Sequence, residues 1–321
     1  MLSPDDIKDA VKALSAGNLI AVPTETVYGL AADAFNSDAV ARIYDAKSRP
    51  HFNPLICHVA GADMASKLVH VSSTAAMLMD AFWPGPLTLV LPALPDNNIS
   101  PLVSAELDTL AVRAPDNATT RLLISALGHP IAAPSANPSG KISPTTAADV
   151  ARTMADNIAC IIDDGPCGIG LESTIIGVDD NVLTLLRPGS VTTEEIEAVC
   201  GQPVHDNKDL AITAPGQLTS HYAPDNRLRM NCSTPDPGEF FIGFGTCAAD
   251  FNLSPSGDLH EAAANLFRAL HIANASGKPI AVAPVPTSGV GLAINDRLGR
   301  AAAPRPAMGG DEQTPTGGHP A

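Results

Sequence analysis

Polar residues and glycines gather in short strings beside apolar, strand-like segments of the chain. The first string is Pro23-Thr24-Glu25-Thr26-Val27-Tyr28-Gly29-Leu30, which directly follows the apolar residues 19–22. It brings together hydroxyls, a carboxylate and a phenol. Because ligands of open α/β sheets bind beyond the ends of strands, the string is a candidate binding segment. A capped helix start would explain it equally well.

Basic residues gather in a second string, although the chain as a whole is acidic with a net charge of −15. Lys47 and Arg49 lie two residues apart, and Asn53 and His58 follow. In extended backbone, residues two apart point to the same side, so this pair would clamp a triphosphate. A solvated charged turn explains Lys47 and Arg49 about as well, and a histidine in an apolar strand is more often a core residue.

A third string, residues 133–145, is rich in small residues that let backbone approach a ligand, with hydroxyls and amides that suit phosphate or ribose oxygens. It is no Walker A loop, and a purely structural loop is a fair alternative. Glu172-Ser173 opens another strand, and Thr109 begins one. Arginines at positions 49, 113 and 187 stand beside turn residues at element ends, which favours anion recognition over surface ion pairing.

Several function classes lose support from what the 321 residues lack. There is no GxSxG, HExxH, kinase motif set or GxGxxG after the first strand, and the six cysteines form no CxxC pair. The acidic charge and the 4% aromatic content disfavour a nucleic-acid-coating surface. The N-terminus has no secretory signal pattern, and no run of eighteen apolar residues predicts a membrane span.

Periodicity predicts a mixed α/β chain. Helices are expected at 3–17, 37–47, 73–82, 117–127, 145–155 and 193–200, each of the last five opened by Ser, Thr or Asn. Strands are expected at 19–22, 55–59, 87–91, 109–114, 131–133 and 158–162, followed by a hairpin around residues 179–181. A second unit has a strand at 239–244, a helix at 259–275, a strand at 279–285 and a last helix ending near 302, which predicts a small parallel sheet.

The domain prediction is a first domain at 1–203, a linker at 204–232, a smaller domain at 233–303 and a frayed tail at 304–321. The linker is predicted because the sequence there is polar and contains Gly and Pro residues that interrupt regular structure. Pro and Gly also dominate the tail, where apolar residues are few.

With these strings in place, the chain resembles the YrdC-like family, in particular its two-domain threonylcarbamoyl-AMP synthases. The resemblance is carried by PTETVYGL at 23–30, KSRPHFNPL at 47–55, PSANPSGKISPT at 134–145, ESTI at 172–175 and LRPG at 186–189, in the family's order. The two-domain type is indicated by HYAP at 221–224 and AINDRL at 293–298. One departure is Ala214-Pro215-Gly216, where the family linker commonly begins with serine, which leaves a linker hydroxyl contact in doubt.

The resemblance implies a twisted open mixed sheet with helices around a concave cavity, followed by a smaller Rossmann-like domain. It also implies a reaction in which ATP, L-threonine and bicarbonate or CO₂ give threonylcarbamoyl-AMP and pyrophosphate, with Mg²⁺ held mainly by the ATP phosphates. The product serves threonylcarbamoyladenosine (t6A) modification of tRNA in the cytoplasm through a separate tRNA threonylcarbamoyl transferase. Stable nucleic-acid binding and membrane association are not expected.

Carried over position by position, the resemblance assigns two sets of residues beside the catalytic pair Lys47 and Arg49. The threonine set is Thr26, His58, Arg113, Ala133 and Ser173. The ATP set is Arg49, Asn53, Thr109, Ser135, Ser143, Arg187, His221 and Tyr222. An RNA-binding or ribosome-associated module without catalysis is the competing hypothesis. A carbamoyl-adenylate enzyme of metal-cofactor maturation is less favoured, since such chains carry further domains that are missing here.

Overall fold

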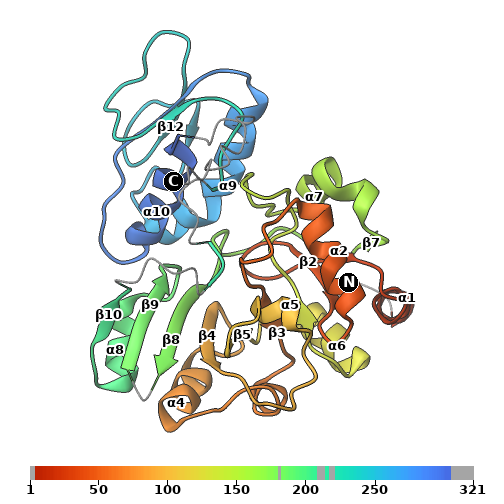
Figure 1. Ribbon diagram of the computed structural model, residues 1–321. Coiled ribbons are helices and arrows are strands. Elements are labelled where there is room, and N and C mark those ends of the chain that lie inside the picture. Colours follow the sequence, from red (N-terminus) through yellow and green to blue (C-terminus); the bar gives the residue numbers. More distant parts are fainter. Residues whose placement is uncertain (1–3, 180–181, 208–213, 217–220, 305–321) are drawn as a thin grey trace, which may run out of the picture.

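Two sheets organise the chain (Figure 1). The computed structural model describes residues 4–179, 182–207, 214–216 and 221–304. The larger sheet has ten strands in the order β10-β9-β8-β4-β5-β3-β6-β2-β1-β7, and the smaller has four in the order β11-β14-β12-β13. The larger sheet mixes parallel and antiparallel pairs, whereas the smaller is parallel throughout. The predicted fold class is therefore confirmed.

The large sheet is built mostly from short strands. Their bounds are β1 Ile20–Val22, β2 Gly29–Asp33, β3 Ile56–His58, β4 Leu87–Pro92, β5 Thr109–Arg113, β6 Ile131–Ala132, β7 Cys160–Ile161, β8 Thr174–Asp179, β9 Val182–Arg187 and β10 Val204–Asp206. The small sheet has β11 Leu228–Arg229, β12 Phe240–Gly243, β13 Phe251–Asn252 and β14 Ile280–Val282. The predicted hairpin is present as the antiparallel pair β8 and β9.

Most of the longer helices begin where a side chain caps the free amides of the first turn. Their bounds are α1 Pro4–Ser15, α2 Ser37–Lys47, α3 Ala62–Ala65, α4 Ser73–Phe82, α5 Pro101–Ser104, α6 Ala118–Leu127, α7 Ala147–Met154, α8 Thr193–Cys200, α9 Leu259–Ala275 and α10 Val290–Ala302, with a 3₁₀ turn at Ala155–Asn157. Asn36, Ser72 and Asn117 each accept a backbone N–H at the start of a helix. Thr146 and Thr192 form capping boxes. Polar residues at these boundaries therefore fix the helix starts much as predicted.

Strand β2 is missing from the prediction, and its absence matters for the site. Its sequence is GLAAD, all five residues are buried, and no polar–apolar alternation marks it. It pairs antiparallel with β1, so residues 23–28 form the connection between two adjacent strands. The first polar string is thereby held in the buried connection between two strands near one edge of the ten-stranded sheet.

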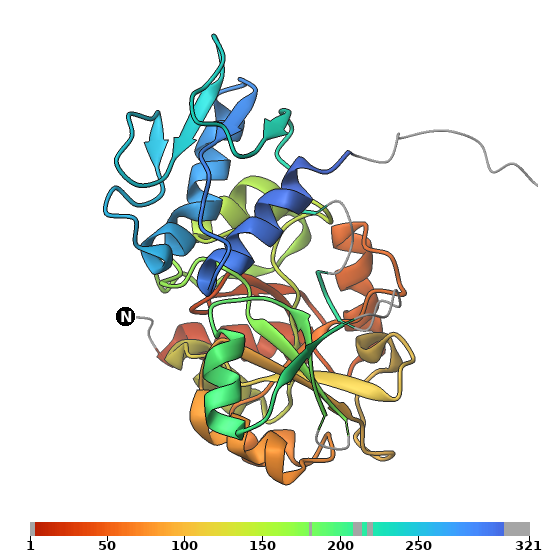
Figure 2. The same ribbon diagram turned by 90° about the vertical axis from the view of Figure 1, so that its left-hand side faces the viewer.

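The C-terminal unit packs closely against the large-sheet unit. Figure 2 shows α10 on the side of the small sheet that faces the large one. Val27, Ile142 and Leu171 belong to the same buried apolar cluster as residues of α9 and α10. At Gly170, which has a positive φ of 70°, an added Cβ would lie 2.6 Å from the backbone oxygen of Ala264. Backbone-to-backbone contact at this point fixes the two units against each other.

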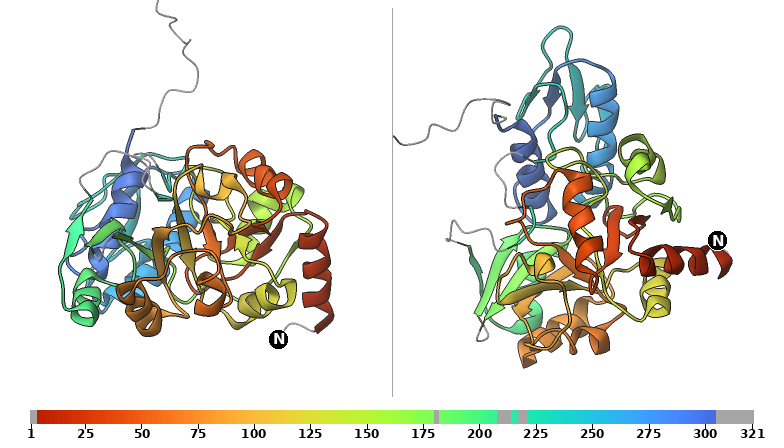
Figure 3. Two further views of the ribbon diagram at one scale, coloured as in Figure 1. Left: turned by 60° about the horizontal axis from the view of Figure 1, so that its bottom comes forward. Right: turned by 45° about the vertical axis from the view of Figure 1, so that its right-hand side comes forward.

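Other parts of the chain frame the ends of the large sheet. Figure 3 shows α1 beside α6 at the end of the molecule away from β9 and β10. The predicted linker is partly ordered into sheets, since β10 extends the large sheet and β11 begins the small one. Apart from Pro304, the predicted tail lies outside the described residues. Among the described residues, none of the helices combines the length and apolar character needed to cross a bilayer.

Candidate active site

A cavity at the junction of the two units brings most of the predicted site residues together. Its empty space is about 550 Å³, which includes the part that opens to solvent. Ten predicted residues line it, namely Thr26, Arg49, His58, Arg113, Ala133, Ser135, Ser173, Arg187, His221 and Tyr222. They come from β3, β5, β9, the connection after β1, the segments after α2, after β6 and before β8, and residues 221–222. Strand ends and their connections therefore build the cavity wall, as the sequence predicts.

Arg113 anchors one end of the cavity from the last position of β5. Its Nη2 donates to Glu25 Oε1 over 2.6 Å, its Nη1 donates to Thr26 Oγ1 over 3.0 Å, and its Nε donates to the Gly85 carbonyl over 3.1 Å. The guanidinium is only 3% exposed. These three contacts hold it in one orientation and leave one N–H on each terminal nitrogen for an anion, because arginine carries five donors.

Three further cations, Lys47, Arg49 and Arg187, meet backbone oxygens in or beside the cavity wall. Lys47 Nζ donates to the carbonyls of Ser135 and Asn137. Arg49 donates to the carbonyls of Asn53 and Pro54 at 3.1 and 2.7 Å. Arg187 donates to the Ser173 carbonyl through Nε and Nη2 at 3.1 and 2.9 Å. Carbonyl dipoles satisfy these groups without neutralising them, so the charge of the two guanidinium groups remains available to an anion.

Burial shapes the proton affinity of this cluster. It lowers the pKa of Arg49 and of Arg187 to about 10, so both guanidinium groups stay charged at neutral pH. Burial, and secondly the charge of Arg49, hold the pKa of Lys47 well below its ordinary value. The same two causes lower the pKa of His221. A bound polyanion would reverse part of this shift by supplying opposite charge.

The position of Lys47 corrects one expectation. Lys47 is the last residue of α2, and Ser48 caps the helix in the left-handed conformation with φ 50°. The Lys47–Arg49 segment is therefore a helix end and no extended strand. Lys47 lies behind the segment 135–137 and is absent from the cavity lining.

Three other predicted ATP contacts also lie outside the lining. Ser143 donates its hydroxyl to Glu172 Oε1 over 2.6 Å. Asn53 is fully buried, and its side-chain amide has no hydrogen-bond partner among the described residues. Thr109 begins β5, four residues before Arg113, and shares its face of the strand. Ala111 lies between them on the same strand and forms a small apolar cluster with Ile56, Val90, Ile175 and Ala214. This cluster therefore separates Thr109 from Arg113.

The described linker residues close the cavity from the outside. Tyr222 is 1% exposed, and its ring lies against His221, 4.1 Å between centroids, and against Phe267. Gly216 has a φ of 87°, and an added Cβ would lie 2.9 Å from Arg187 Cδ and 3.2 Å from the Tyr222 hydroxyl oxygen. Ala214 packs its methyl group into the small apolar cluster, where a serine hydroxyl would meet apolar neighbours.

His58 is buried beside Arg113 and should make stability depend on pH. Burial, and secondly Arg113, lower the pKa of His58 to about 3, against about 6.5 in an unfolded chain. Between these values the unfolded state binds the extra proton, so the free energy of unfolding should fall as the pH falls, by about 2 kcal/mol at pH 5 from this residue.

Replacing His58 by glutamine should flatten this dependence. We expect the urea midpoint of His58→Gln to change less between pH 7 and pH 5 than that of the wild type. The comparison is between the changes of the urea midpoint with pH in the two proteins, so a loss of stability that is the same at both pH values cancels. Exposed His70 provides the control, His70→Gln, whose curve should parallel the wild type. Parallel curves for wild type and His58→Gln would contradict the assignment.

Buried polar atoms without a partner mark the small cavity as the place for a ligand. Among the described residues they include Glu25 Oε2, His58 Nδ1, His221 Nδ1 and Arg297 Nη2. Such atoms are costly when buried, unless a ligand or water satisfies them. They lie on or next to residues of the cavity wall.

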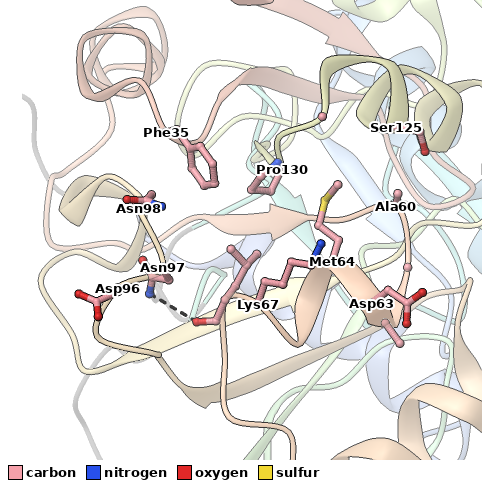
Figure 4. Close-up of a pocket in the computed structure, with 14 residues that line it drawn as sticks. Phe35, Ala60, Asp63, Met64, Lys67, Asp96, Asn97, Asn98, Ser125 and Pro130 are labelled. Atoms are coloured by element: carbon pink, nitrogen blue, oxygen red, sulfur yellow. Dashed lines mark hydrogen bonds between the residues drawn. The ribbon is translucent and has the colours of Figure 1, made fainter.

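A larger hollow elsewhere has no comparable chemistry (Figure 4). It holds about 1560 Å³ of space open to solvent, between Phe35 and Pro130 on one side and Met64 on the other. Its charged residues Asp63, Lys67 and Asp96 are exposed. None of the predicted site residues lines it. Size alone therefore does not identify the functional site.

Two acidic residues and one arginine beside the cavity were assigned no role from sequence. Glu25 and Glu172 each pair with a buried arginine, and Arg297 reaches Glu172 from α10. All three fall inside strings that the sequence analysis quoted, at 23–30, 172–175 and 293–298. Membership of these strings was the one feature of the sequence that could have pointed to them. The described residues contain no group of three or more His, Cys, Asp or Glu side chains placed to hold a metal ion.

Comparison with known proteins gives matches over nearly the whole chain. Residues 12–189 match the Sua5_yciO_yrdC family, described as "Telomere recombination", and residues 191–303 match the family described as "Threonylcarbamoyl-AMP synthase, C-terminal domain". The threonylcarbamoyl-AMP synthase of Bacillus subtilis is 42% identical over 332 residues, covering 95% of each chain. That of Pyrococcus abyssi is 39% identical, covering 92% of this chain and 93% of the relative. The crystal structure of P. abyssi Sua5 complexed with L-threonine superposes with a TM-score of 0.86 at 37% identity, covering 94% and 95% of the two chains.

Proposed function

Because this chain belongs to the two-domain threonylcarbamoyl-AMP synthase family, we propose that the cavity between its two units is the active site of that synthesis. The enzyme is an ATP-using nucleotidyltransferase whose product serves t6A modification of tRNA. In the reaction, ATP, L-threonine and bicarbonate or CO₂ give threonylcarbamoyl-AMP and pyrophosphate.

The observation that carries the assignment is buried positive charge facing one cavity in an acidic protein. Arg49 and Arg187 line the cavity, are at most 7% exposed and bond to carbonyl oxygens, and Lys47 lies behind them. Burying such groups costs free energy that an anionic substrate would recover. A nucleotide triphosphate, held at this end, matches that charge.

The other end suits an amino acid. Arg113 would bind the threonine carboxylate through its two remaining terminal N–H groups, with Thr26, His58, Ala133 and Ser173 around the rest of the molecule. Ser173 Oγ lies 2.7 Å from Thr88 Oγ1 and also accepts from Arg187 Nη2 over 3.1 Å. Ser173 therefore stands where the two substrates would meet.

The chemistry needs position and charge more than a protein nucleophile. The threonine amine loses a proton and adds to CO₂, giving a carbamate. A carbamate oxygen then attacks the α-phosphorus of ATP while the bond to pyrophosphate breaks. Arg49 and Arg187, with Lys47 behind, would stabilise the charge that develops on the phosphates. We propose that Mg²⁺ enters as part of the ATP complex, since Glu25 and Glu172 are already paired with arginines.

Pyrophosphate release tests the proposal directly. Purified protein with MgATP, L-threonine and bicarbonate should release pyrophosphate, and leaving out threonine or bicarbonate should abolish release. Replacing L-threonine by L-valine, which has the same shape without the hydroxyl, serves as the matched substrate control. ATP left intact under every combination would overturn the proposal.

The competing RNA-binding module gains nothing from this geometry. Arg49, Arg113 and Arg187 are buried in the wall of a small cavity, whereas an RNA backbone needs clustered basic charge on the protein surface. We propose instead that the adenylate is passed to a tRNA threonylcarbamoyl transferase in the cytoplasm. The match of residues 191–303 to the threonylcarbamoyl-AMP synthase C-terminal domain also favours the synthase over a metal-cofactor maturation enzyme.

A further inference from the structure

Arg297 of α10 crosses from the C-terminal unit to the wall of the cavity. Its side chain is 0% exposed, and its Nε donates to Glu172 Oε2 over 2.9 Å. The other carboxylate oxygen of Glu172 accepts the Ser143 hydroxyl over 2.6 Å. Glu172 itself lines the cavity. A single carboxylate therefore ties α10 to the small-residue string 133–145.

The same guanidinium also contacts the linker. Its central carbon lies 5.4 Å from the centroid of the Tyr222 ring, within the range of a cation–π contact. Its Nη1 donates to Asp296 Oδ2 over 2.7 Å, which fixes the plane of the group. Its Nη2 is buried and has no partner among the described residues. Arg297 thus supports Glu172 and Tyr222 together.

Stability alone does not account for this arrangement. The junction already has an apolar core containing Val27, Leu171 and Phe267. A buried ion pair commonly contributes no more than apolar residues of the same volume. The planar guanidinium of Arg297, in contrast, fixes the positions of Glu172 and Tyr222 relative to each other. A site for a charged substrate needs such fixed positions.

The contacts of Arg297 lead to Ser173, where the two substrates would meet, and to Arg187 at the nucleotide end, but not to Arg113. Glu172 precedes Ser173, whose carbonyl receives Arg187. Tyr222 packs against Arg297, and its hydroxyl oxygen lies near Gly216, next to Arg187. The side chain of Arg113 is held by hydrogen bonds to Glu25, Thr26 and Gly85. Among the described residues, none of these three is a hydrogen-bond partner of Arg297.

We propose that Arg297 is a positioning residue for ATP, which through Glu172 and Tyr222 sets the nucleotide end of the active site. This inference rests on the proposed function of the cavity. It assigns the C-terminal unit a part in substrate binding, which one side chain carries through Glu172 and Tyr222. It also predicts that disturbing Arg297 affects the two substrates unequally.

The experiment compares Arg297→Met with Arg300→Met. Arg300 lies on the same helix and donates to the same residue, Asp296, over 3.0 Å, but it is 23% exposed. Each variant is assayed for pyrophosphate release with ATP and with threonine varied in turn. Binding of α,β-methylene-ATP is measured separately by calorimetry, since this analogue cannot be cleaved at the reacting bond. Thermal unfolding shows whether each variant is folded.

For Arg297→Met we expect the KM for ATP and the Kd of the analogue to rise at least tenfold, with the KM for threonine within threefold. Arg300→Met should leave all three within threefold. Arg297→Lys keeps a charge but lacks the planar fork, so it should raise the two nucleotide constants three- to tenfold.

A folded Arg297→Met with unchanged analogue binding, or with both KM values raised equally, would overturn the inference. If that variant does not fold, unchanged analogue binding in Arg297→Lys overturns it. A wild type that fails to release pyrophosphate would contradict the proposed function instead.

Discussion

Replacing Arg113 by alanine is expected to lower kcat/KM for L-threonine about 100-fold, while the KM for ATP changes less than threefold. Hydrogen bonds to charged groups contribute about 1.5–3 kcal/mol each, and a loss of about 2.7 kcal/mol corresponds to 100-fold. Arg113 lies at the end of the cavity away from Lys47 and Arg49, so its loss should leave the nucleotide contacts in place. Steady-state pyrophosphate release with each substrate varied measures both constants.

The Glu25 contact requires a second variant. Arg113 holds Glu25 over 2.6 Å with both side chains at most 11% exposed, so Arg113→Ala leaves a buried carboxylate unpaired, at about 3–5 kcal/mol of stability. The double variant Arg113→Ala/Glu25→Gln should recover much of that stability without recovering threonine use. Arg121→Ala, which breaks the more exposed pair with Asp116, is the control. Nucleotide affinity lost as severely as threonine affinity would refute the assignment.

Gly189→Ala should be among the most damaging single substitutions in this protein. An added Cβ would lie 2.3 Å from the Thr174 amide nitrogen and 2.7 Å from the Ser173 carbonyl carbon. Both are backbone atoms at the start of β8, so neither can move aside as a flexible side chain could. We expect a loss of at least about 3 kcal/mol, which for a unit of this size lowers Tm by about 10 °C.

Activity should fall with stability in Gly189→Ala, because Ser173 lies in the cavity wall and Arg187 bonds to its carbonyl. Thermal unfolding and pyrophosphate release, measured below the new Tm, separate the two effects. Gly168 has no atom within 4 Å of an added Cβ, so Gly168→Ala is the matched control and should behave as the wild type. A Gly189→Ala protein with wild-type Tm would show that β8 and the 187–189 turn separate freely.

Much of this fold was predictable because local chemistry decides it. Asn36, Ser72 and Thr192 start helices by binding free amides, and the sequence displays them at the right places. Strand β2 was not predictable in the same way. Its five residues are small or apolar without alternation, and it becomes a strand only because β1 and β6 lie on either side.

The site was predictable as a set of strings but not as a set of contacts. Strings that follow β1 and β6, precede β3, or flank β8 and β9 meet because those strands share one sheet. Sequence periodicity does not reveal that Lys47 bonds to the carbonyl of Ser135, or that Ser143 gives its hydroxyl to Glu172. The pairing of Arg297 with Glu172 joins residues 125 positions apart, and only the docking of α10 creates it.

The shared core between the two units has a consequence for synthesis of the protein on the ribosome. Val27 belongs to the first polar string, yet it packs in one cluster with Leu298 and Ala301 near the end of α10. Domains usually fold as they emerge, the N-terminal one first. Here the first unit leaves the ribosome with Val27, Ile142 and Leu171 still uncovered and Glu172 still without its arginine. A nascent chain therefore completes its active site only when nearly all of it has been translated, so unfinished chains should not consume ATP and threonine.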